Sequence, residues 1–258
     1  MGADVLVLGG LGINCEEETK YAFELAGANP KIVHVNDLIK GLDKLEDYQI
    51  LAFPGGFSYG DDTGAGLALA NKIRNNMWQD LLDFVRSDNL AIGICNGFQV
   101  MTNLGLLPGY AVALTHNTSA RYSCRWVDLE FQGKSPWTKD VGQISIPIAH
   151  AEGRFYASPE VLEHIKGKGL IAAQYVKGEI CKYQNLSANP NGSLEDIASV
   201  TDTTGRLIGM MPHPERAIYF THRPDWTLKK EQLKRKGEEL PEYGPGIKIF
   251  QNAVEYFQ

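Results

Sequence analysis

Residues 90–99, LAIGICNGFQ, join an apolar run directly to a glycine-flanked cysteine and then to a stretch with helical spacing. Leu90–Ile94 has the composition of a buried parallel strand, and a helix is expected from about 96 to 104. Between them, Gly93-Ile94-Cys95-Asn96-Gly97 has the form G-x-C-x-G, typical of a nucleophile elbow, in which a sharp strand-to-helix turn lifts the side chain above the sheet edge. The alternative is a buried structural cysteine between packing glycines. The strand–turn–helix context favours the elbow.

Strand and helix signals alternate along the first hundred residues. Further strands are expected at 4–8, 31–35 and 49–53, and helices at 15–26 and at 65–86, the latter with a break near 75–76. Such alternation predicts an α/β fold: an open, mostly parallel sheet with helices on both faces. The second half offers short strands at 125–131, 143–148, 170–177, 197–201 and 206–211, and a last helix at 246–257. We expect these strands to be extra antiparallel or edge strands within one domain, residues 1–258.

Composition excludes several classes of function. The 258 residues carry a formal net charge of −6, which argues against a nucleic-acid partner because such proteins usually expose a basic surface. The N-terminus shows no secretory leader, and no stretch reaches the roughly 18 apolar residues of a membrane helix. The four cysteines form no C-x-x-C pair. We therefore expect a cytoplasmic protein with reduced thiols and no metal ligands.

A second glycine-rich loop follows another expected strand. Pro54-Gly55-Gly56 comes directly after 49–53, and open parallel sheets bind their ligands beyond the carboxyl ends of the strands. A Gly-Gly pair at that edge lets backbone N–H groups approach a ligand closely. The N–H groups of Gly56 and of Asn96, which follows Cys95, are therefore candidate donors to an oxyanion. An ordinary Pro-Gly turn explains the loop equally well when it is considered alone.

A histidine between two prolines closes a further short strand. The prolines of Pro212-His213-Pro214-Glu215 stiffen the backbone around His213. In an extended segment Glu215 lies on the same side as His213 and can orient its imidazole. A lone histidine is more often structural, but this one has an acid two residues away. We interpret Cys95, His213 and Glu215 as a candidate nucleophile, base and orienting acid.

Other patterns carry less weight. Gly9-Gly10-Leu11-Gly12 after the first strand hints at a dinucleotide loop, but the third glycine of G-x-G-x-x-G falls on Cys15, so we interpret it as a tight turn. No P-loop is present, which argues against ATP chemistry in this chain. The charge run at 229–240 is interpreted as a solvated helix or loop, with a contact to a partner protein as the alternative.

Taken together, these segments resemble the class I, triad-type glutamine amidotransferases. The closer resemblance is to the glutaminase components of phosphoribosylformylglycinamidine synthase, and it spans nearly the whole chain. The similar segments are PGGFSYGDD at 54–62, GICNGFQVMTNLGLLPG at 93–109, NTSARYSCRWV at 117–127, AHAEGRF at 149–155, NPNGS at 189–193, MPHPERA at 211–217 and GIKIFQNAVEYF at 246–257. Two departures stand out: Phe98 replaces a smaller residue, and 219–243 is longer than expected for a stand-alone subunit.

The resemblance implies a function. A chain of this family hydrolyses glutamine to glutamate and ammonia, and Gln99 is implied to help hold the substrate beside Gly55 and Gly56. The ammonia is implied to pass to a synthetase subunit that uses ATP and magnesium to convert formylglycinamide ribonucleotide to formylglycinamidine ribonucleotide in purine biosynthesis. A small accessory subunit is implied as well. No cofactor is implied for this chain itself.

Three alternatives remain open at this point. The first is a glutaminase subunit of another amidotransferase, which would share the triad and differ in the outer segments. The second is a γ-glutamyl hydrolase or cysteine peptidase with the same elbow. The third is a glutamine-sensing or scaffold subunit, which has no need of a nucleophile with a base and an orienting acid.

Overall fold

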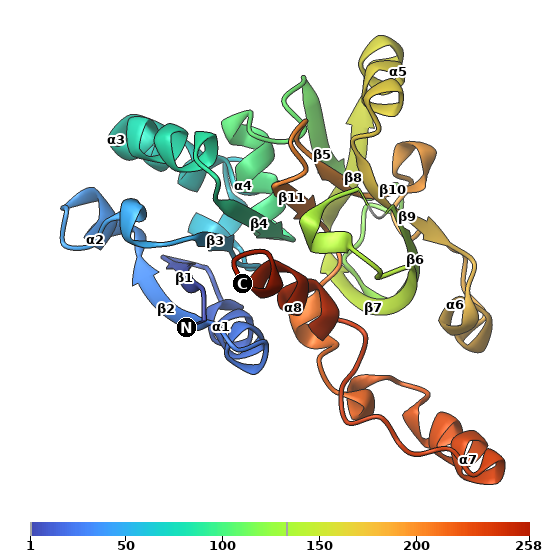
Figure 1. Cartoon of the computed structure of the whole chain (residues 1–258). Helices are drawn as coiled ribbons and strands as arrows, with labels where there is room; N and C mark the ends of the chain where they lie inside the picture. The colour runs from blue at the N-terminus through green and yellow to red at the C-terminus, as the bar shows by residue number, and fades with distance from the viewer. Residues whose placement is uncertain (1, 133) are drawn as a thin grey trace.

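The computed structural model describes residues 2–132 and 134–258 and has the expected α/β architecture (Figure 1). A nine-stranded sheet runs in the order β2-β1-β3-β4-β11-β10-β9-β6-β7, and β5 pairs with β8 in a separate two-stranded sheet. The strands are β1 (Asp4–Gly9), β2 (Asn29–His34), β3 (Ile50–Phe53), β4 (Leu90–Ile94), β5 (Val112–His116), β6 (Ser123–Phe131), β7 (Gln143–His150), β8 (Glu152–Ala157), β9 (Ile171–Val176), β10 (Ile197–Thr201) and β11 (Leu207–Met210).

The two halves of the large sheet differ in strand direction. The strands from β2 to β11 are parallel to their neighbours. The strands from β11 to β7 pair antiparallel throughout. The expected fold class, with extra antiparallel strands contributed by the second half, is therefore confirmed. At the far edge of the antiparallel part, β7 contacts the residues that follow β11.

The described part of the chain also contains eight α-helices. They are α1 (Glu16–Leu25), α2 (Val35–Ile39), α3 (Leu67–Arg86), α4 (Asn96–Leu104), α5 (Pro159–Lys168), α6 (Glu179–Gln184), α7 (Trp226–Lys236) and α8 (Ile247–Glu255). α3 and α4 pack together on one face of the parallel strands, and α1 and α8 pack together on the other (Figure 1). The break expected in α3 falls at Met77, whose backbone leaves the helical region.

Several elements differ from the sequence expectation: β5, β8, α2 and α6 were not expected, and two further differences have a clear physical reason. The second strand ends at His34 rather than at residue 35, because the His34 side chain accepts a hydrogen bond from the N–H of Asn36 and starts α2 there. The helix at 159–168 is absent from the elements expected above. Its signals are nonetheless present, since Ser158 caps its first turn, Pro159 opens it and Gly169 closes it in a left-handed conformation.

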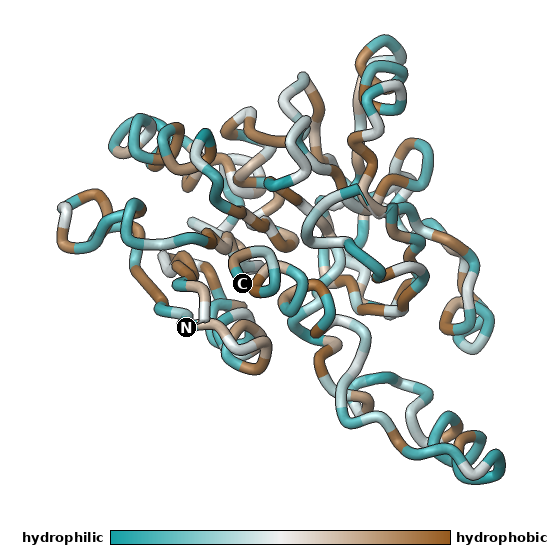
Figure 2. Tube along the Cα trace, viewed as in Figure 1, coloured by the Kyte–Doolittle hydropathy of each residue, from teal (hydrophilic) through white to brown (hydrophobic). Residues whose placement is uncertain are grey.

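Burial explains why the parallel strands have unbroken apolar sequences. Every residue of β3, β4 and β11 is buried, because helices cover both faces of these strands. Figure 2 shows the corresponding apolar centre beneath hydrophilic outer helices. Phe250 of α8 packs against Phe23 of α1, and the two rings meet edge to face at a centroid distance of 4.9 Å.

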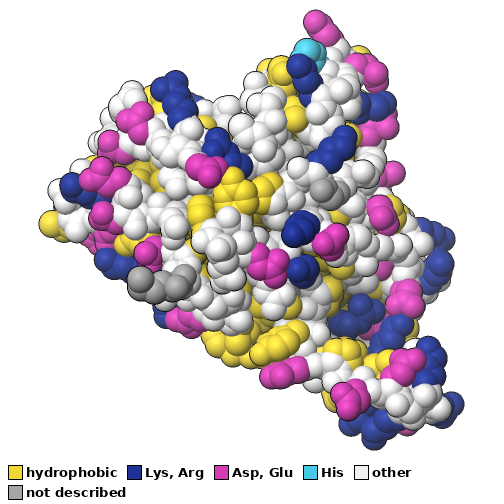
Figure 3. Space-filling view, in the orientation of Figure 1, with side chains coloured by type: hydrophobic (Ala, Val, Ile, Leu, Met, Phe, Trp, Pro, Cys, Tyr) yellow, Lys and Arg dark blue, Asp and Glu magenta, His cyan; other side chains and the backbone are white. Residues whose placement is uncertain are grey.

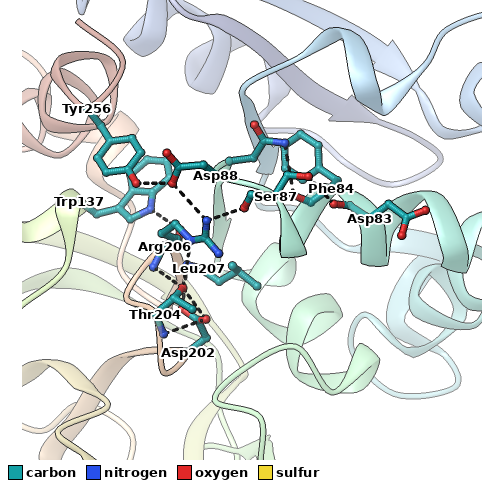
Figure 4. A network of polar contacts seen from close by, with 11 residues as sticks. Asp83, Phe84, Ser87, Asp88, Trp137, Asp202, Thr204, Arg206, Leu207 and Tyr256 are labelled. Atoms are coloured by element: carbon teal, nitrogen blue, oxygen red, sulfur yellow. Dashed lines mark hydrogen bonds and ion pairs between the residues drawn. The ribbon is translucent and has the colours of Figure 1, made fainter.

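A polar network fastens the amino ends of β4 and β11 (Figure 4). The guanidinium of Arg206 donates to the carbonyl of Ser87 and pairs with Asp88 at 3.2 Å, which joins the end of α3 to the start of β11. Tyr256, just past α8, donates to the same Asp88 carboxylate at 2.6 Å, and the indole of Trp137 donates to the carbonyl of Arg206 at 2.8 Å. The network holds the strands at the end opposite to their carboxyl edge.

The long 219–243 segment forms an arm that projects from the body of the protein (Figure 1). Its base is closed by an antiparallel bridge between Tyr219 and Tyr243, whose rings are stacked at 6.0 Å. Its tip is α7, so the charge run is largely helical, and Figure 3 shows Lys and Arg side chains gathered there. Among the described residues, no helix has the length and apolar character needed to cross a membrane.

Candidate active site

The segments singled out from the sequence meet at one edge of the sheet. β3, β4 and β11 are adjacent parallel strands, with Phe53 opposite Gly93 and Ile94 opposite Met210. Their carboxyl ends deliver the Gly55-Gly56 loop, the cysteine elbow and the His213 segment to the same place. This is the edge at which open α/β sheets bind their ligands.

Cys95 occupies a sharp turn between β4 and α4. Its backbone has φ 53° and ψ −107°, a conformation that costs a non-glycine residue about 1–3 kcal/mol. The surrounding structure enforces it, because the Cys95 N–H donates to the carbonyl of Met210 at 2.7 Å. The neighbouring glycine is required by space, since a Cβ at Gly97 would stand 1.9 Å from the carbonyl oxygen of Phe53. The thiol is buried and lies 3.6 Å from the carbonyl oxygen of Ala149 in β7.

Gly55 marks the point where the candidate side chains converge. A Cβ at this position would stand 2.8 Å from Cε1 of His213, 3.5 Å from Cβ of Cys95 and 3.1 Å from Sγ of Cys15. The imidazole and both cysteines therefore surround one backbone atom that carries no side chain. This is a packing reason for glycine, in addition to the backbone access expected from the sequence.

His213 and Glu215 form a buried pair. Nδ1 of His213 and Oε1 of Glu215 are 2.6 Å apart, and both side chains are at least 98% buried. We expected an extended segment to place Glu215 beside His213, and this expectation is wrong. Residues Pro214–Arg216 form a 3-10 turn that begins after His213, and this turn brings the acid back onto the ring.

The pair leaves one ring nitrogen of His213 for chemistry. Because Nδ1 bonds to Glu215, Nδ1 carries the proton and Nε2 faces the interior without a hydrogen-bond partner in the described part of the chain. Burial by itself lowers the pKa of His213, but the charges of Glu215 and Cys95 raise it, and its pKa lies well above the ordinary value. An imidazolium held in this way can balance negative charge that develops beside it, so the arrangement is suited to nucleophilic attack on a carbonyl carbon.

The residues proposed to hold the substrate lie around the elbow. Gly56 has φ 152°, and the Asn96 N–H lies in the first turn of α4, where no intrahelical acceptor exists. The Asn96 side chain accepts from the N–H of Ser58 at 3.2 Å and donates to the amide oxygen of Gln99 at 2.9 Å. Gln99 in turn donates to the carbonyl of Glu152. Gln99 is thus part of a buried network that links the Gly55-Gly56 loop to the β7–β8 turn.

Two residues near the site were missed by the sequence analysis. Cys15 is fully buried beside His213, and Arg216 donates to its sulfur at 2.9 Å. Cys15 lies just beyond β1, which neighbours β3, so its position at the same sheet edge was open to inference from the strand order. Arg216 directly follows the His-x-Glu segment and belongs to its turn.

Fold and site together define a class of α/β protein, one with a cysteine on a strand-to-helix elbow beside a buried His–Glu pair. Residues 3–257 match the CobB/CobQ-like glutamine amidotransferase domain. The chain is 51% identical to phosphoribosylformylglycinamidine synthase subunit PurQ of Methanococcus maripaludis strain S2, a match that covers 98% of this chain and 97% of that one. The same subunit of Dehalococcoides mccartyi strain 195 is 40% identical, with 97% and 96% covered.

A solved structure extends this likeness to the fold. A chain in the structure of PurLQS from Thermotoga maritima superposes with a TM-score of 0.75 at 31% identity, and each chain is covered completely. The chain described here therefore belongs to the glutamine amidotransferase family, within the group of PurQ subunits of phosphoribosylformylglycinamidine synthase.

Proposed function

We propose that this chain, acting as a single domain over residues 1–258, hydrolyses glutamine and supplies the ammonia to a synthetase. The observation that carries the proposal is the buried His213–Glu215 pair, whose Nε2 has no partner within residues 2–132 and 134–258 and faces the interior next to the strained Cys95 elbow. A pair of this kind fixes the tautomer and orientation of a base. The relatives named as PurQ subunits support the choice of reaction.

The proposed reaction begins with attack of the Cys95 thiolate on the side-chain amide carbon of glutamine. The oxyanion accepts hydrogen bonds from the N–H groups of Gly56 and Asn96, which replace water in a buried site. His213 gives its proton to the departing nitrogen, ammonia leaves, and a glutamyl thioester remains on Cys95. His213 then takes a proton from water, the resulting hydroxide attacks the thioester, and glutamate and the thiol are released. Glu215 holds His213 throughout.

Substrate binding is proposed for Gly55, Gly56, Asn96 and Gln99. The Gly55-Gly56 loop and the elbow are tied together through the Asn96 side chain, so the two oxyanion donors keep a fixed separation. The amide of Gln99 closes the same network against the β7–β8 turn. A group that positions donors in this way contributes to catalysis through orientation.

The partners proposed for this chain follow from its relatives. A synthetase subunit would use ATP and magnesium to convert formylglycinamide ribonucleotide to formylglycinamidine ribonucleotide in de novo purine biosynthesis, and a small accessory subunit would complete the assembly. The name of the Thermotoga maritima complex, PurLQS, is consistent with such an assembly. No cofactor is proposed for this chain, and the cytoplasm is its proposed location.

The test is glutamate release from glutamine by the purified chain, alone and together with a synthetase subunit, formylglycinamide ribonucleotide and ATP. The expected result is a rate that rises with the synthetase and disappears in Cys95→Ala, while Cys124→Ala, which alters an exposed thiol, retains it. Cleavage of γ-glutamyl peptides in place of free glutamine would instead identify a γ-glutamyl hydrolase. Turnover of neither substrate would leave a sensing or scaffold role.

A further inference from the structure

The Cys15 thiol is a nucleophilic group that the proposed reaction does not use. It stands immediately before α1, where its N–H donates to the carbonyl of Gly55 at 3.2 Å, and its side chain is 99% buried. Buried free cysteines usually pack against apolar side chains. This one lies among charged groups, with Nη2 of Arg216 at 2.9 Å from its sulfur.

Cys15 forms a cluster of potential metal ligands with the His–Glu pair. One ligand atom each from Cys15, His213 and Glu215 can be chosen so that all lie within 4.8 Å of one another, and all three side chains are at least 98% buried. Nε2 of His213 and Oε2 of Glu215 have no hydrogen-bond partner among residues 2–132 and 134–258. An unpaired buried polar atom is costly, so a cation that satisfies the free Oε2 of Glu215 gains stability from it.

The types of donor atom determine which metal ion the site binds. A thiolate, an imidazole and a carboxylate are the groups that bind Zn²⁺, with bond lengths of about 2.0–2.3 Å. Two of the three donors carry a negative charge when they bind, and together these charges match a divalent cation. Magnesium and calcium ions are not expected to bind tightly here, because they prefer sites made of oxygen atoms. The remaining coordination positions would go to water or to a neighbouring group.

We propose that Cys15, His213 and Glu215 form an inhibitory site for zinc and similar thiophilic divalent cations. The ion takes Nδ1 of His213, which faces Glu215, in place of its proton, and the positive charge on the ring then opposes the protonation of Nε2 that the proposed reaction needs. No local sequence pattern indicates such a site, because residue 15 is far in sequence from the His-x-Glu segment.

Arg216 must release the sulfur before the ion binds. Its side chain is 37% exposed, and it already lies 3.5 Å from Glu18, so a carboxylate outside the site is within reach as an alternative partner. The guanidinium therefore competes with the cation for Cys15. Replacing Arg216 with glutamine removes this competitor and is expected to tighten zinc binding.

The direct test uses cadmium, whose bond to a thiolate gives an ultraviolet charge-transfer band. The full-length Cys95→Ala, Cys124→Ser protein retains Cys15 and Cys181 and is titrated with Cd²⁺. A saturable band at one ion per chain is expected, and it is lost when Cys15→Ser or Cys15→Ala is added. Adding Cys181→Ser instead removes another buried thiol and leaves the band in place. Unchanged far-ultraviolet circular dichroism and Tm confirm that each variant folds.

A second measurement connects binding to activity. Zinc is expected to inhibit glutamate release by the chain with its synthetase, and chelation should reverse the inhibition. In Cys15→Ser, the zinc concentration that halves the rate, relative to the same variant without zinc, should rise at least about tenfold, the range seen when metal sites lose supporting groups. A cadmium band that survives loss of Cys15, or equal zinc sensitivity of both proteins, would overturn the proposal. The cadmium test needs no enzymatic turnover, so it can fail or succeed independently of the proposed function.

Discussion

Replacement of Gly97 by alanine tests the reasoning about the elbow most directly. Gly97 lies in the first turn of α4, where alanine normally stabilises a helix by about 1 kcal/mol relative to glycine. Here the added Cβ would stand 1.9 Å from the carbonyl oxygen of Phe53, 2.6 Å from its carbonyl carbon and 2.8 Å from its Cβ. These are largely backbone atoms, so no change of rotamer relieves the overlap.

The size of the effect follows from how far α4 and β3 must separate. Ordinary van der Waals contact begins at about 3.4 Å, so the helix and strand must move apart by more than 1 Å. Overpacking of this kind costs about 1–3 kcal/mol, and we expect a loss near the upper end because backbone is involved. The displacement also moves the loop after Phe53 away from Cys95. A misplacement of about 1 Å in an active site lowers the rate by roughly 100-fold.

The assay is urea denaturation followed by circular dichroism, together with glutamate release at saturating glutamine. Gly167→Ala is the matched control, because Gly167 lies in α5, is exposed, and would have nothing within 4 Å of an added Cβ. We expect Gly167→Ala to be stabilised by about 0.5–1 kcal/mol with unchanged activity. The same substitution thus has opposite signs at the two sites.

Equal stability of Gly97→Ala and the unaltered protein would contradict the predicted overlap with Phe53. That result would mean that the helix and strand are not in contact through Gly97. A destabilised variant with full glutaminase activity would mean that Gly97 packs against Phe53 but that this contact does not set the position of the Gly55-Gly56 loop.

Three further changes give distinct readouts. Glu215→Gln removes the charge that holds the His213 imidazolium, so the rate of thioester formation should fall by about 10²–10⁴-fold in single-turnover measurements. Burial and the nearby charge of His213 lower the pKa of His150 to about 3, so the folded state resists a proton that the unfolded chain accepts below about pH 6.5. As the pH is lowered from about 6 to 4, the unfolding free energy of the unaltered protein should therefore fall more steeply than that of His150→Asn, by about 1.4 kcal/mol for each pH unit. Asn252→Ala removes amide donors to two carbonyls in 137–139 and should cost about 2–3 kcal/mol by urea denaturation.

Each of these has its own contradicting outcome. A Glu215→Gln protein with near-normal single-turnover rates would show that the acid does not orient the base. Parallel pH profiles of stability for the unaltered protein and His150→Asn would show that His150 is protonated in the folded state. An Asn252→Ala protein of unchanged stability would mean that water replaces the lost amide donors.

The sequence identified the candidate nucleophile, base and acid because each lies in a local pattern with a local physical reason. Glycines around Cys95 permit a strained turn, and prolines around His213 limit its backbone. Strand–helix alternation then implied that these patterns follow parallel strands and meet at one edge. The resemblance to known amidotransferases rested on the same residues, and the relatives confirmed the family.

Tertiary structure decided what depends on the order of strands and on side chains distant in sequence. Nothing in the pattern of the second half indicated that β10, β9, β6 and β7 continue the sheet in that order, because short alternating strands accept many pairings. The same order brings the carbonyl of Ala149 to the Cys95 thiol.

The sequence by itself thus determined the fold class and the three residues of the candidate triad. Only the folded chain placed Cys15 and Arg216 beside them, across roughly 200 positions. The physical reason is that periodicity and turn chemistry act between near neighbours in the chain. Contacts between residues far apart depend on which strands pair and how closely their helices pack, and these are set by burial and volume over the whole protein.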